Sequence, residues 1–598
     1  MVGVVGSSPI APTNTQARHE LIVSGFVVGW HSVSRWVGNT PMKADWLPGL
    51  LAKDSWIWGL ILAVYALFVM QGFGPFLDDG HGFRQAQTAI SARYFQTLGD
   101  FVTYATPVVG VPWSIPFEFP LYQALVKGLS RASGIDLVRC GRIVSMLFFL
   151  ACVVPLAGLA RLAGAQRPAL ALVPVMLAPL YLFWSRAVLI ETTALFFTLM
   201  FGWRMALRLS APAFEVLAWR EGLSIALLGS LASLCKVTTF LPVLAGVLVW
   251  LVVQMWQRRA GIGRDRWVSR VALAGAGLAP LLVGMAWVRH TDALKQLNPI
   301  GAALTSQALR KWNFGTLADR GDPAVWHDLA RRATDIVFPL PPVSADLRWP
   351  LAGLWVAVMA VALWHCDHRR RRWIAGLLAL FVLPMALFTN LHRVHDYYQV
   401  ANGVFLLLAF GLAIEGAMLR LERSDRPHHP NGSPAGPPEA SRGWRGNTFA
   451  RRAIGVGGLA LLAVSLLFAQ TRYELRTTHA AHRAGLVALL ERITSHGQVL
   501  VITGLDWSPL VPFEVERRAL MLPDWASAEM ADQAVAALRR SGSEVGALLV
   551  CGADRPSTPR VRSLLLAAEQ GPVAHVDGCE VFSMPAGVTP ASTATVRP

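Results

Sequence analysis

Long apolar runs alternate with short polar and basic runs along most of this chain of 598 residues. A helix needs roughly 17–25 predominantly apolar residues to cross a bilayer. Runs of this kind predict an all-α polytopic membrane domain over residues 51–470, with about eleven transmembrane helices. We expect these helices near 55–74, 141–160, 168–185, 190–208, 222–237, 238–257, 271–288, 349–366, 373–389, 399–419 and 453–470.

The short loops between the apolar runs divide into a basic set and a set with few charges. Lys and Arg collect in the cytoplasmic loops of membrane proteins. The basic loops lie within 161–167, 204–220, 258–270, 369–372 and 420–452. We therefore expect a multi-pass protein of the cell inner (plasma) membrane, with a cytoplasmic N-terminus and a periplasmic or external C-terminal domain. Loops 75–140 and 289–348 then lie on the external side.

Two segments lack the pattern of a folded domain. Residues 1–50 form an N-terminal extension, which we expect to be disordered or a mis-assigned start with Met42 as the true first residue. The apolar run at 21–30 is too short to span a bilayer. Residues 421–452 are rich in Pro, Gly and Ser, which is typical of a flexible cytoplasmic linker.

The tail, residues 471–598, has the pattern of a small extramembrane α/β domain. The apolar runs 497–504 and 545–552 predict buried strands, and 573–584 predicts a terminal strand pair. Helical periodicity occupies 527–540 and 560–571. Cys551 and Cys579 would both lie on strands, where a disulfide and two buried free thiols are equally open interpretations.

The composition agrees with a membrane protein. Hydrophobic residues make up 54% and charged residues only 15%, with a mean hydropathy of +0.44, whereas soluble domains carry roughly 25% charged residues. This excludes an ordinary soluble enzyme and a disordered chain. The net charge of +17 suggests nucleic acid, but the basic residues stand in short runs between apolar stretches. They are topology signals, and no nucleic-acid partner is expected.

The densest polar stretch follows the first expected span. Asp78, Asp79, His81, Arg84, Gln85, Gln87 and Thr88 fall within eleven positions. The spacing predicts a helix over 83–98 that lies along the membrane interface, and Glu118 follows in an aromatic stretch. Ionisable groups at a membrane boundary are costly unless they line a wet cavity or a site.

Glycosyl transfer from a lipid-linked sugar fits these residue types. A carboxylate acts as general base on an acceptor hydroxyl, an arginine holds a phosphate leaving group, and amides orient sugar hydroxyls. We expect Asp79, or else Asp78, to be catalytic. The alternative is a structural loop in which one aspartate caps the helix and pairs with Arg84. His81, Arg84, Gln85, Gln87 and Glu118 are the candidate substrate-binding residues in this loop.

Further candidates for substrate binding lie at other external helix ends, each with a structural alternative. Arg186 and Glu191 either pair with each other or contact a donor phosphate. Lys236 either snorkels to the surface or binds phosphate. His395, Tyr397 and Tyr398 belong to a compact polar and aromatic turn, where the tyrosines are either interface anchors or part of a site.

The order of several motifs resembles the GT-C superfamily of membrane glycosyltransferases. The likeness is to the family 39 group of protein O-mannosyltransferases and aminoarabinose-transferase-like enzymes, and it covers about 75–420. It rests on the acidic pair, HGFRQAQTA, EFPLYQ, SRAVLIETTALFF, WNFGTLADR and HDYYQV. The resemblance implies a catalytic carboxylate in the first external loop, a polyprenyl-phosphate sugar donor and inversion at the anomeric carbon. Family members usually carry Asp-Glu at the pair, whereas this chain has Asp-Asp.

These observations predict a hexosyl- or pentosyltransferase that moves a sugar from a polyprenyl-phosphate donor to a glycan, lipid or protein acceptor on the periplasmic face. The alternative is a lipid-linked sugar transporter or flippase, although no internal repeat is visible. No cofactor is expected. A divalent metal at Asp78, Asp79 and His81 is the second choice, because carboxylates suit Mg²⁺ or Mn²⁺ but the resemblance favours a metal-independent enzyme. In the second loop, 322–337 predicts an amphipathic helix.

Overall fold

The computed structural model describes residues 54–77, 80–211, 217–257, 264–339, 346–424, 454–469, 483–552 and 572–584. The chain divides into two compact units, Met1–Gly59 and Leu60–Pro598, and of the first unit the structure describes residues 54–59. Four expectations lie outside the described residues: the extension 1–50, nearly all of the linker 421–452, the helix at 560–571, and the acidic pair Asp78 and Asp79.

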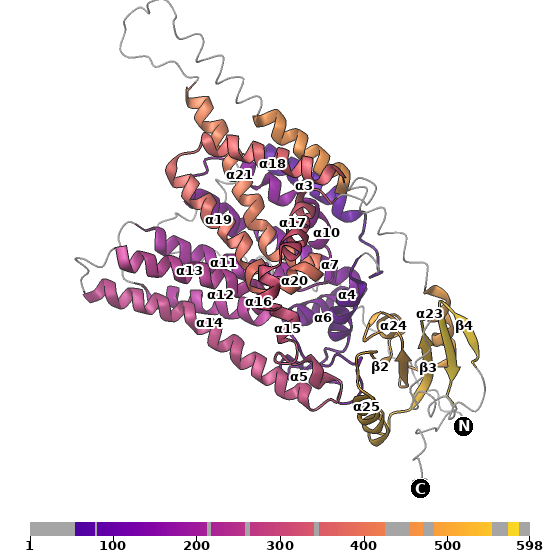
Figure 1. Cartoon of the computed structure of the whole chain (residues 1–598). Helices are drawn as coiled ribbons and strands as arrows, with labels where there is room; N and C mark the ends of the chain where they lie inside the picture. Colours follow the sequence, from indigo (N-terminus) through magenta and orange to yellow (C-terminus); the bar gives the residue numbers. More distant parts are fainter. Residues whose placement is uncertain are drawn as a thin grey trace, which may run out of the picture. The chain divides into compact units, whose positions relative to one another are not determined.

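Each expected apolar span coincides with a helix or with two consecutive helices (Figure 1). Within the described residues, four helical stretches are long and apolar enough to cross a membrane: Leu137–Leu162, Val237–Gln257, Trp267–Gln296 and Asp396–Glu422. The apolar helices Ser55–Met70, Arg348–Trp364 and Ile454–Ala469 are shorter. The number of about eleven spans therefore stays a prediction. The helices are α3 (Ser55–Met70), α7 (Leu137–Ala151), α8 (Val153–Leu162), α9 (Pro168–Met176), α10 (Pro179–Trp184), α11 (Glu191–Ser210), α12 (Trp219–Cys235), α13 (Val237–Gln257), α14 (Arg264–Gln296), α18 (Arg348–Trp364), α19 (His368–Leu387), α21 (Gln399–Ser424) and the unlabelled helix Ile454–Ala469.

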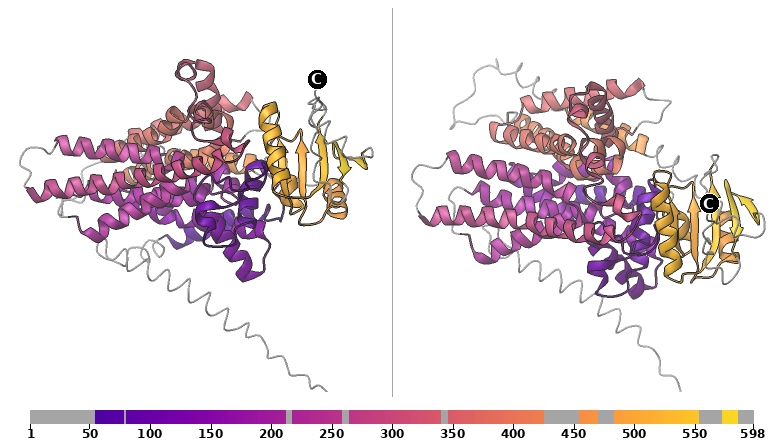
Figure 2. Two further views of the ribbon diagram at one scale, coloured as in Figure 1. Left: turned by 90° about the horizontal axis from the view of Figure 1, so that it is seen from below. Right: turned by 60° about the horizontal axis from the view of Figure 1, so that its bottom comes forward.

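Two of the expected spans differ from the helices observed. The span expected over 168–185 is broken between α9 and α10, because Pro179 has no amide hydrogen with which to continue a helix. The span expected to end near 288 continues as α14 to Gln296, which brings Lys295 into the helix. Helices α12, α13 and α14 run side by side in the views of Figures 1 and 2.

The helix expected over 83–98 is α4 (Gly82–Arg93), which ends five residues earlier. Every residue from Gln85 to Ala92 is buried in the protein, and the position of α4 along the membrane interface stays a prediction. Ala86, Ala89 and Ala92 allow neighbouring segments to approach α4 closely. The first loop also contains α5 (Asp100–Thr103) and α6 (Leu121–Ser133).

The second loop contains the amphipathic helix expected over 322–337, observed as α17 (Pro323–Val337). Asp322 caps it by accepting a 2.8 Å hydrogen bond from the Ala324 amide, and Pro323 occupies the first turn, where its missing donor costs nothing. The remaining short helices around the loops are η1 (Gly301–Leu304), α15 (Arg310–Phe314), α16 (Leu317–Gly321), α20 (Thr389–Val394) and η3 (Asp396–Tyr398).

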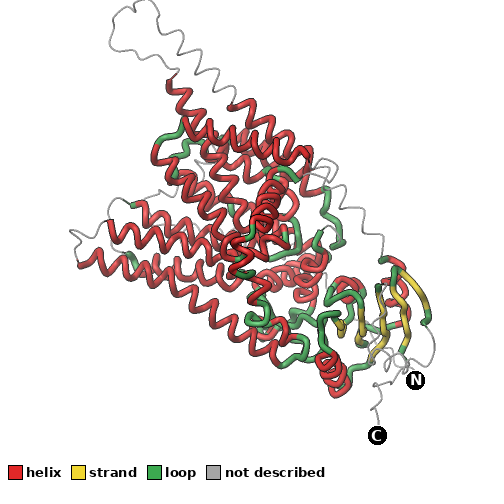
Figure 3. The backbone as a smooth tube through the Cα atoms, viewed as in Figure 1, coloured by secondary structure: helices red, strands yellow, loops and turns green. Residues whose placement is uncertain are grey.

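The C-terminal segment forms a five-stranded sheet with the order β2-β1-β3-β5-β4. The strands gather in one region of the structure, drawn in yellow in Figure 3. Strand β1 pairs in parallel with β2 and β3, whereas β5 is antiparallel to β3 and β4. The strand expectations are met by β1, β3, β4 and β5, and a disulfide joins Cys551 to Cys579. The elements are α23 (Ala484–Ile493), β1 (Val499–Thr503), α24 (Leu510–Glu514), β2 (Arg518–Leu522), α25 (Ala528–Arg540), β3 (Val545–Cys551), β4 (Ala574–Val576) and β5 (Cys579–Ser583).

Candidate functional site

Two buried side chains hold the chain on both sides of the acidic pair. Arg142 of α7 donates to the carbonyls of Gly74 (3.1 Å) and Phe76 (2.6 Å). Gln85 of α4 donates to the Gly80 carbonyl (2.8 Å) and accepts from the Val188 amide (2.9 Å). Segments 74–76 and 80 are therefore fixed to the helices beneath them. This is the support that a catalytic carboxylate requires, because such groups act at a defined distance from the reacting atom.

We expect Arg142→Met to loosen the segment before the acidic pair. The substitution removes charge-assisted hydrogen bonds to two backbone carbonyls, which are worth roughly 1.5–3 kcal/mol each. Hydrogen exchange of the peptide around Gly74 should quicken, and the thermal unfolding temperature of the purified protein should fall. Arg139→Met is the matched control, because Arg139 lies one turn earlier on α7 and is 44% exposed. Equal exchange in both variants would contradict the role of Arg142.

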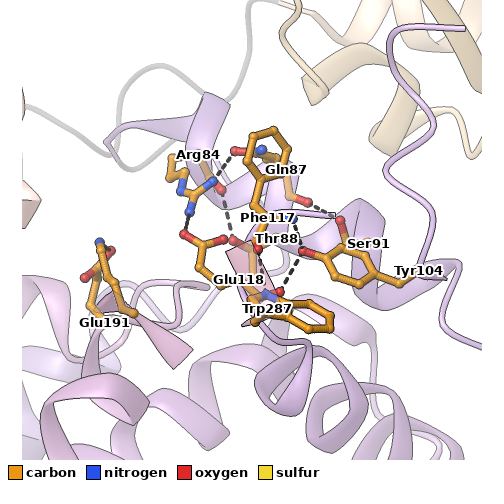
Figure 4. Close-up of polar contacts among 10 residues, drawn as sticks. Arg84, Gln87, Thr88, Ser91, Tyr104, Phe117, Glu118, Glu191 and Trp287 are labelled. Atoms are coloured by element: carbon orange, nitrogen blue, oxygen red, sulfur yellow. Dashed lines mark hydrogen bonds and ion pairs between the residues drawn. The ribbon is translucent and has the colours of Figure 1, made fainter. Parts of the chain in front are cut away.

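The central ion pair of the site joins Arg84 to Glu118. Arg84 also donates to the Gln87 side chain, so both of its terminal nitrogens are engaged (Figure 4). Burial lowers the pKa of Arg84, but Glu118, Tyr397, Tyr398 and Glu191 together outweigh this effect, and the pKa lies above its ordinary value. Arg84 therefore stays cationic at any physiological pH.

The backbone around Glu118 is fixed on several sides. The Tyr104 hydroxyl accepts from the Phe117 amide (2.7 Å) and donates to the Glu118 carbonyl (2.9 Å). The Trp287 indole of α14 donates to the Phe117 carbonyl (3.0 Å). Figure 4 shows these groups surrounding the ion pair. The backbone of Glu118 is therefore held in place, and its carboxylate is positioned to pair with Arg84.

A second group of residues surrounds His81, which begins α4 in a left-handed conformation with φ 44°. Its Nε2 atom lies 2.8 Å from the Asp396 carboxylate. The imidazole ring also contacts Trp184, His395 and Tyr397, with ring centroids 5.2–5.7 Å apart. Burial lowers the pKa of His395 to about 4, so this ring is neutral at neutral pH.

Lys236 and Glu191 form a buried ion pair, with side chains only 4% and 2% exposed. The Lys236 ammonium also lies 4.2 Å from the centre of the Tyr398 ring and 5.3 Å from that of Tyr397. Two structural alternatives from the sequence are therefore wrong. Glu191 pairs with Lys236 and not with Arg186, and Lys236 does not snorkel to the surface, because the polar partner that satisfies it lies inside the protein.

The structure brings most of the candidate residues together. Arg84 lies near Glu191, Tyr397 and Tyr398, which contribute to raising its pKa. Gln85 and Gln87 follow Arg84 on α4, and Gln85 donates to the Gly80 carbonyl. Arg186 donates to the Val69 carbonyl (3.4 Å) at the end of α3. The gathered candidates are His81, Arg84, Gln85, Gln87, Glu118, Glu191, Lys236, His395, Tyr397 and Tyr398.

Three residues near the site were not identified from the sequence. Arg142 had a signal, since a charged residue inside the apolar run 141–160 requires a buried partner. Lys295 lies 4.6 Å from the centre of the Phe117 ring, but it follows the expected end of its span. Tyr104 carries no local signal, because its hydrogen bonds reach a segment more than ten residues further along the chain.

Two adjoining cavities lie beside the His81 group. One of about 30 Å³ is lined by Asp396, Gln399, Ile336 and the end of the helix Ile454–Ala469. The other, of about 200 Å³, is lined almost wholly by apolar side chains, with Val337 and Ser465 among them. Ile336 of α17 lines the first cavity and its neighbour Val337 lines the second, so the two cavities lie close to each other.

Among the residues that the structure describes, which do not include Asp78 and Asp79, no group of three His, Cys, Asp or Glu side chains is arranged to hold a metal ion. The metal hypothesis rests on the acidic pair, so it stays a prediction.

Comparison with known proteins identifies the fold. No protein-family model matches the chain, and no curated protein matches it by sequence. Among solved structures, ArnT from Cupriavidus metallidurans bound to undecaprenyl phosphate is similar, with 15% identity over 90% of this chain and 99% of that chain and a TM-score of 0.54. The oligosaccharyltransferase AglB from Archaeoglobus fulgidus, in complex with an inhibitory peptide and a dolichol-phosphate, is 12% identical over 83% of this chain and 69% of that chain, with a TM-score of 0.50. The chain therefore has a GT-C fold, as the sequence motifs suggested.

Proposed function

We propose that this protein is a membrane glycosyltransferase that moves a hexose or pentose from a polyprenyl-phosphate carrier to a glycan, lipid or protein acceptor. One observation carries the proposal: a cluster of polar and charged side chains, which includes His81 and Asp396, lies near an apolar cavity. A lipid-linked sugar has the same two parts, an apolar chain and a charged head. The GT-C fold shared with ArnT and AglB agrees with this chemistry.

In this proposal the apolar cavity receives the end of the carrier chain nearest to the phosphate. About 200 Å³ accommodates only a few isoprene units, so the rest of the carrier stays in the lipid. Trp355 and Phe410 line the cavity with stacked rings whose centroids are 4.7 Å apart. The adjoining small cavity, which Asp396 and Gln399 line, then leads the head group towards His81.

The charged residues have separate roles in the proposed reaction. Asp79, or else Asp78, removes the proton from the acceptor hydroxyl as that oxygen attacks the anomeric carbon. The bond from this carbon to the phosphate oxygen breaks, and the polyprenyl phosphate leaves as an anion. Arg84 neutralises the charge that develops on the phosphate, while Glu118 and Gln87 hold the guanidinium in place. No step requires an oxidant or a cofactor.

The proposed reaction takes place on the external face of the inner membrane, with the domain 471–598 on the same side. The disulfide between Cys551 and Cys579 supports this side, because disulfides persist in oxidising compartments and are rare in the cytosol. The basic loops identified in the sequence support the same orientation.

The direct test uses the purified full-length protein and a polyprenyl-phosphate sugar labelled in the sugar. A glycosyltransferase transfers the label to an acceptor fraction from the cell envelope and releases polyprenyl phosphate. A flippase moves the labelled lipid between leaflets of a vesicle without consuming it. Intact donor after incubation with the full range of envelope acceptors would overturn the proposal.

We expect Arg84→Ala to weaken use of the donor more than use of the acceptor. The variant should raise the donor KM and lower kcat, together by about 10²–10³-fold in kcat/KM, because it removes the cation that neutralises the leaving phosphate. Arg84→Lys should recover part of the loss, since it keeps the charge without the planar donors. Steady-state kinetics at varied donor concentration measure both. Unchanged donor kinetics in Arg84→Ala would exclude contact with the phosphate.

A further inference from the structure

The first external loop and the C-terminal sheet are joined by backbone hydrogen bonds. The Ala519 amide donates to the Pro107 carbonyl (3.0 Å), the Met521 amide to the Val108 carbonyl (2.8 Å), and the Gly110 amide to the Ala519 carbonyl (3.2 Å). Val109 and Leu520 form an antiparallel bridge. Residues 107–110 thus extend the sheet at the outer edge of β2. Gly110 is required there, because its φ is +81° and a Cβ atom would lie 2.9 Å from the Leu520 side chain.

Trp507, which follows β1, contacts two aromatic rings of the first loop. Its indole meets the Phe83 ring edge-on, with centroids 4.9 Å apart, and stacks with the Phe117 ring at 5.9 Å. Phe83 immediately precedes Arg84, and Phe117 immediately precedes Glu118. The same indole therefore touches the neighbour of each member of the central ion pair. A shift of Trp507 would displace both sides of the pair at once.

Other residues of the same C-terminal segment hold both ends of α4. The Leu510 side chain packs beside Gly82, where an added Cβ atom would lie 3.3 Å from its methyl groups. At the far end, Arg93 donates to the Phe513 carbonyl, and its guanidinium lies 4.0 Å from the centre of the Phe513 ring. Segment 507–513 is therefore a support along the length of the helix that carries Arg84.

We infer that Trp507 is a positioning residue that aligns Arg84 with Glu118 and so sets the affinity for the phosphate of the lipid-linked donor. The inference rests on the proposed function for its ligand and on the contacts of Phe83 and Phe117 for its geometry. The C-terminal domain then has a part in donor binding. The first external loop carries the residues that bind the donor, and the C-terminal domain holds this loop in place.

The test compares Trp507→Ala with Trp507→Phe in the full-length protein. Trp507→Ala should raise the donor KM about tenfold, because it removes two aromatic contacts, while kcat with saturating donor falls by less. Trp507→Phe should recover most of the affinity. Trp525→Ala is the matched control, because Trp525 lies in the same domain, is 45% exposed and bonds to Asp506. It should leave the donor KM unchanged.

A double-mutant cycle separates positioning from a general loss of structure. In the Arg84→Ala background, Trp507→Ala should add little to the donor KM, because the group that it aligns is already absent. Additive effects on the donor KM would overturn the inference. An unchanged donor KM in Trp507→Ala alone would overturn it as well.

Hydrogen exchange tests the geometry without any assay of transfer. Trp507→Ala should quicken exchange of the peptides around Phe83 and Phe117, while strands β1 and β3 stay protected as in the unsubstituted protein. If exchange changes as expected but no lipid-linked sugar is consumed by the unsubstituted protein, the proposed function fails and the positioning contact stands. Unchanged exchange at both peptides would refute the contact itself.

Discussion

Replacing Asp79 with alanine is expected to lower sugar transfer by about 10²–10⁴-fold, the contribution of a positioned general base. Asp79 is the second residue of the acidic pair and leads directly into His81 and α4. Arg142 and Gln85 donate hydrogen bonds to the carbonyls of Phe76 and Gly80, on either side of the pair. The backbone that carries the base would therefore be held in one position. Transfer of labelled sugar at saturating donor and acceptor measures the effect.

The matched control for this prediction is Asp78→Ala, which changes the neighbouring carboxylate. If Asp79 is the base, Asp78→Ala retains much more activity than Asp79→Ala. Both variants should keep the unfolding temperature of the unsubstituted protein, so that a loss of transfer reflects chemistry. Full activity in Asp79→Ala would remove it as the base, and the reverse order of the two variants would assign the role to Asp78.

Removing one member of the Lys236–Glu191 pair should destabilise the protein by about 3–5 kcal/mol, because a buried charge is left without its partner. Lys236→Met leaves the Glu191 carboxylate buried without a partner. Glu191→Leu leaves the Lys236 ammonium buried without a partner. The double variant should lose much less than the sum of the two, since no charge is stranded. Thermal or denaturant unfolding in a fixed detergent or nanodisc measures all three.

The control for the ion pair is an exposed pair elsewhere in the protein. Arg393 and Asp328 lie 3.0 Å apart, with side chains 43% and 31% exposed. Arg393→Met should cost at most about 1 kcal/mol, since solvent screens exposed pairs. If Lys236→Met costs no more than Arg393→Met, the burial of the Lys236–Glu191 pair contributes nothing to stability.

The sequence predicted the helices better than their lengths. An apolar run predicts that a helix is present and where its centre lies. The residue at which the helix ends depends on helix-breaking residues and on tertiary contacts. Pro179 ends the span expected over 168–185, and α14 continues past the apolar run to Gln296. The strand β2 was not expected, although its residues 519–522 are buried. One edge of this short strand pairs with β1, and the other edge bonds to the first loop.

The composition of the candidate site was predicted better than its pairing. Polar residues beside apolar runs marked His81, Arg84 and Glu118 as candidates, and the structure brings them close to one another. Pairing between distant segments carries no local signal, so the sequence favoured Arg186 as the partner of Glu191. Residues five apart along the chain were an obvious choice, whereas the actual partner, Lys236, comes from the junction of α12 and α13, 45 positions further on. Supports such as Tyr104 are invisible for the same reason.

The strand that residues 107–110 add to β2 has a consequence for how the protein is made. The two segments that pair, residues 107–110 and β2, are separated by roughly 400 residues of chain. A ribosome adds about 5–20 residues per second, so the first loop waits on the order of 20–80 s for its binding edge to emerge. During that interval the carbonyls of Pro107 and Val108 and the amide of Gly110 lack the partners that β2 provides in the folded protein. Ribosome-bound chains that stop short of β2 should therefore be the ones that proteases and chaperones of the receiving compartment recognise.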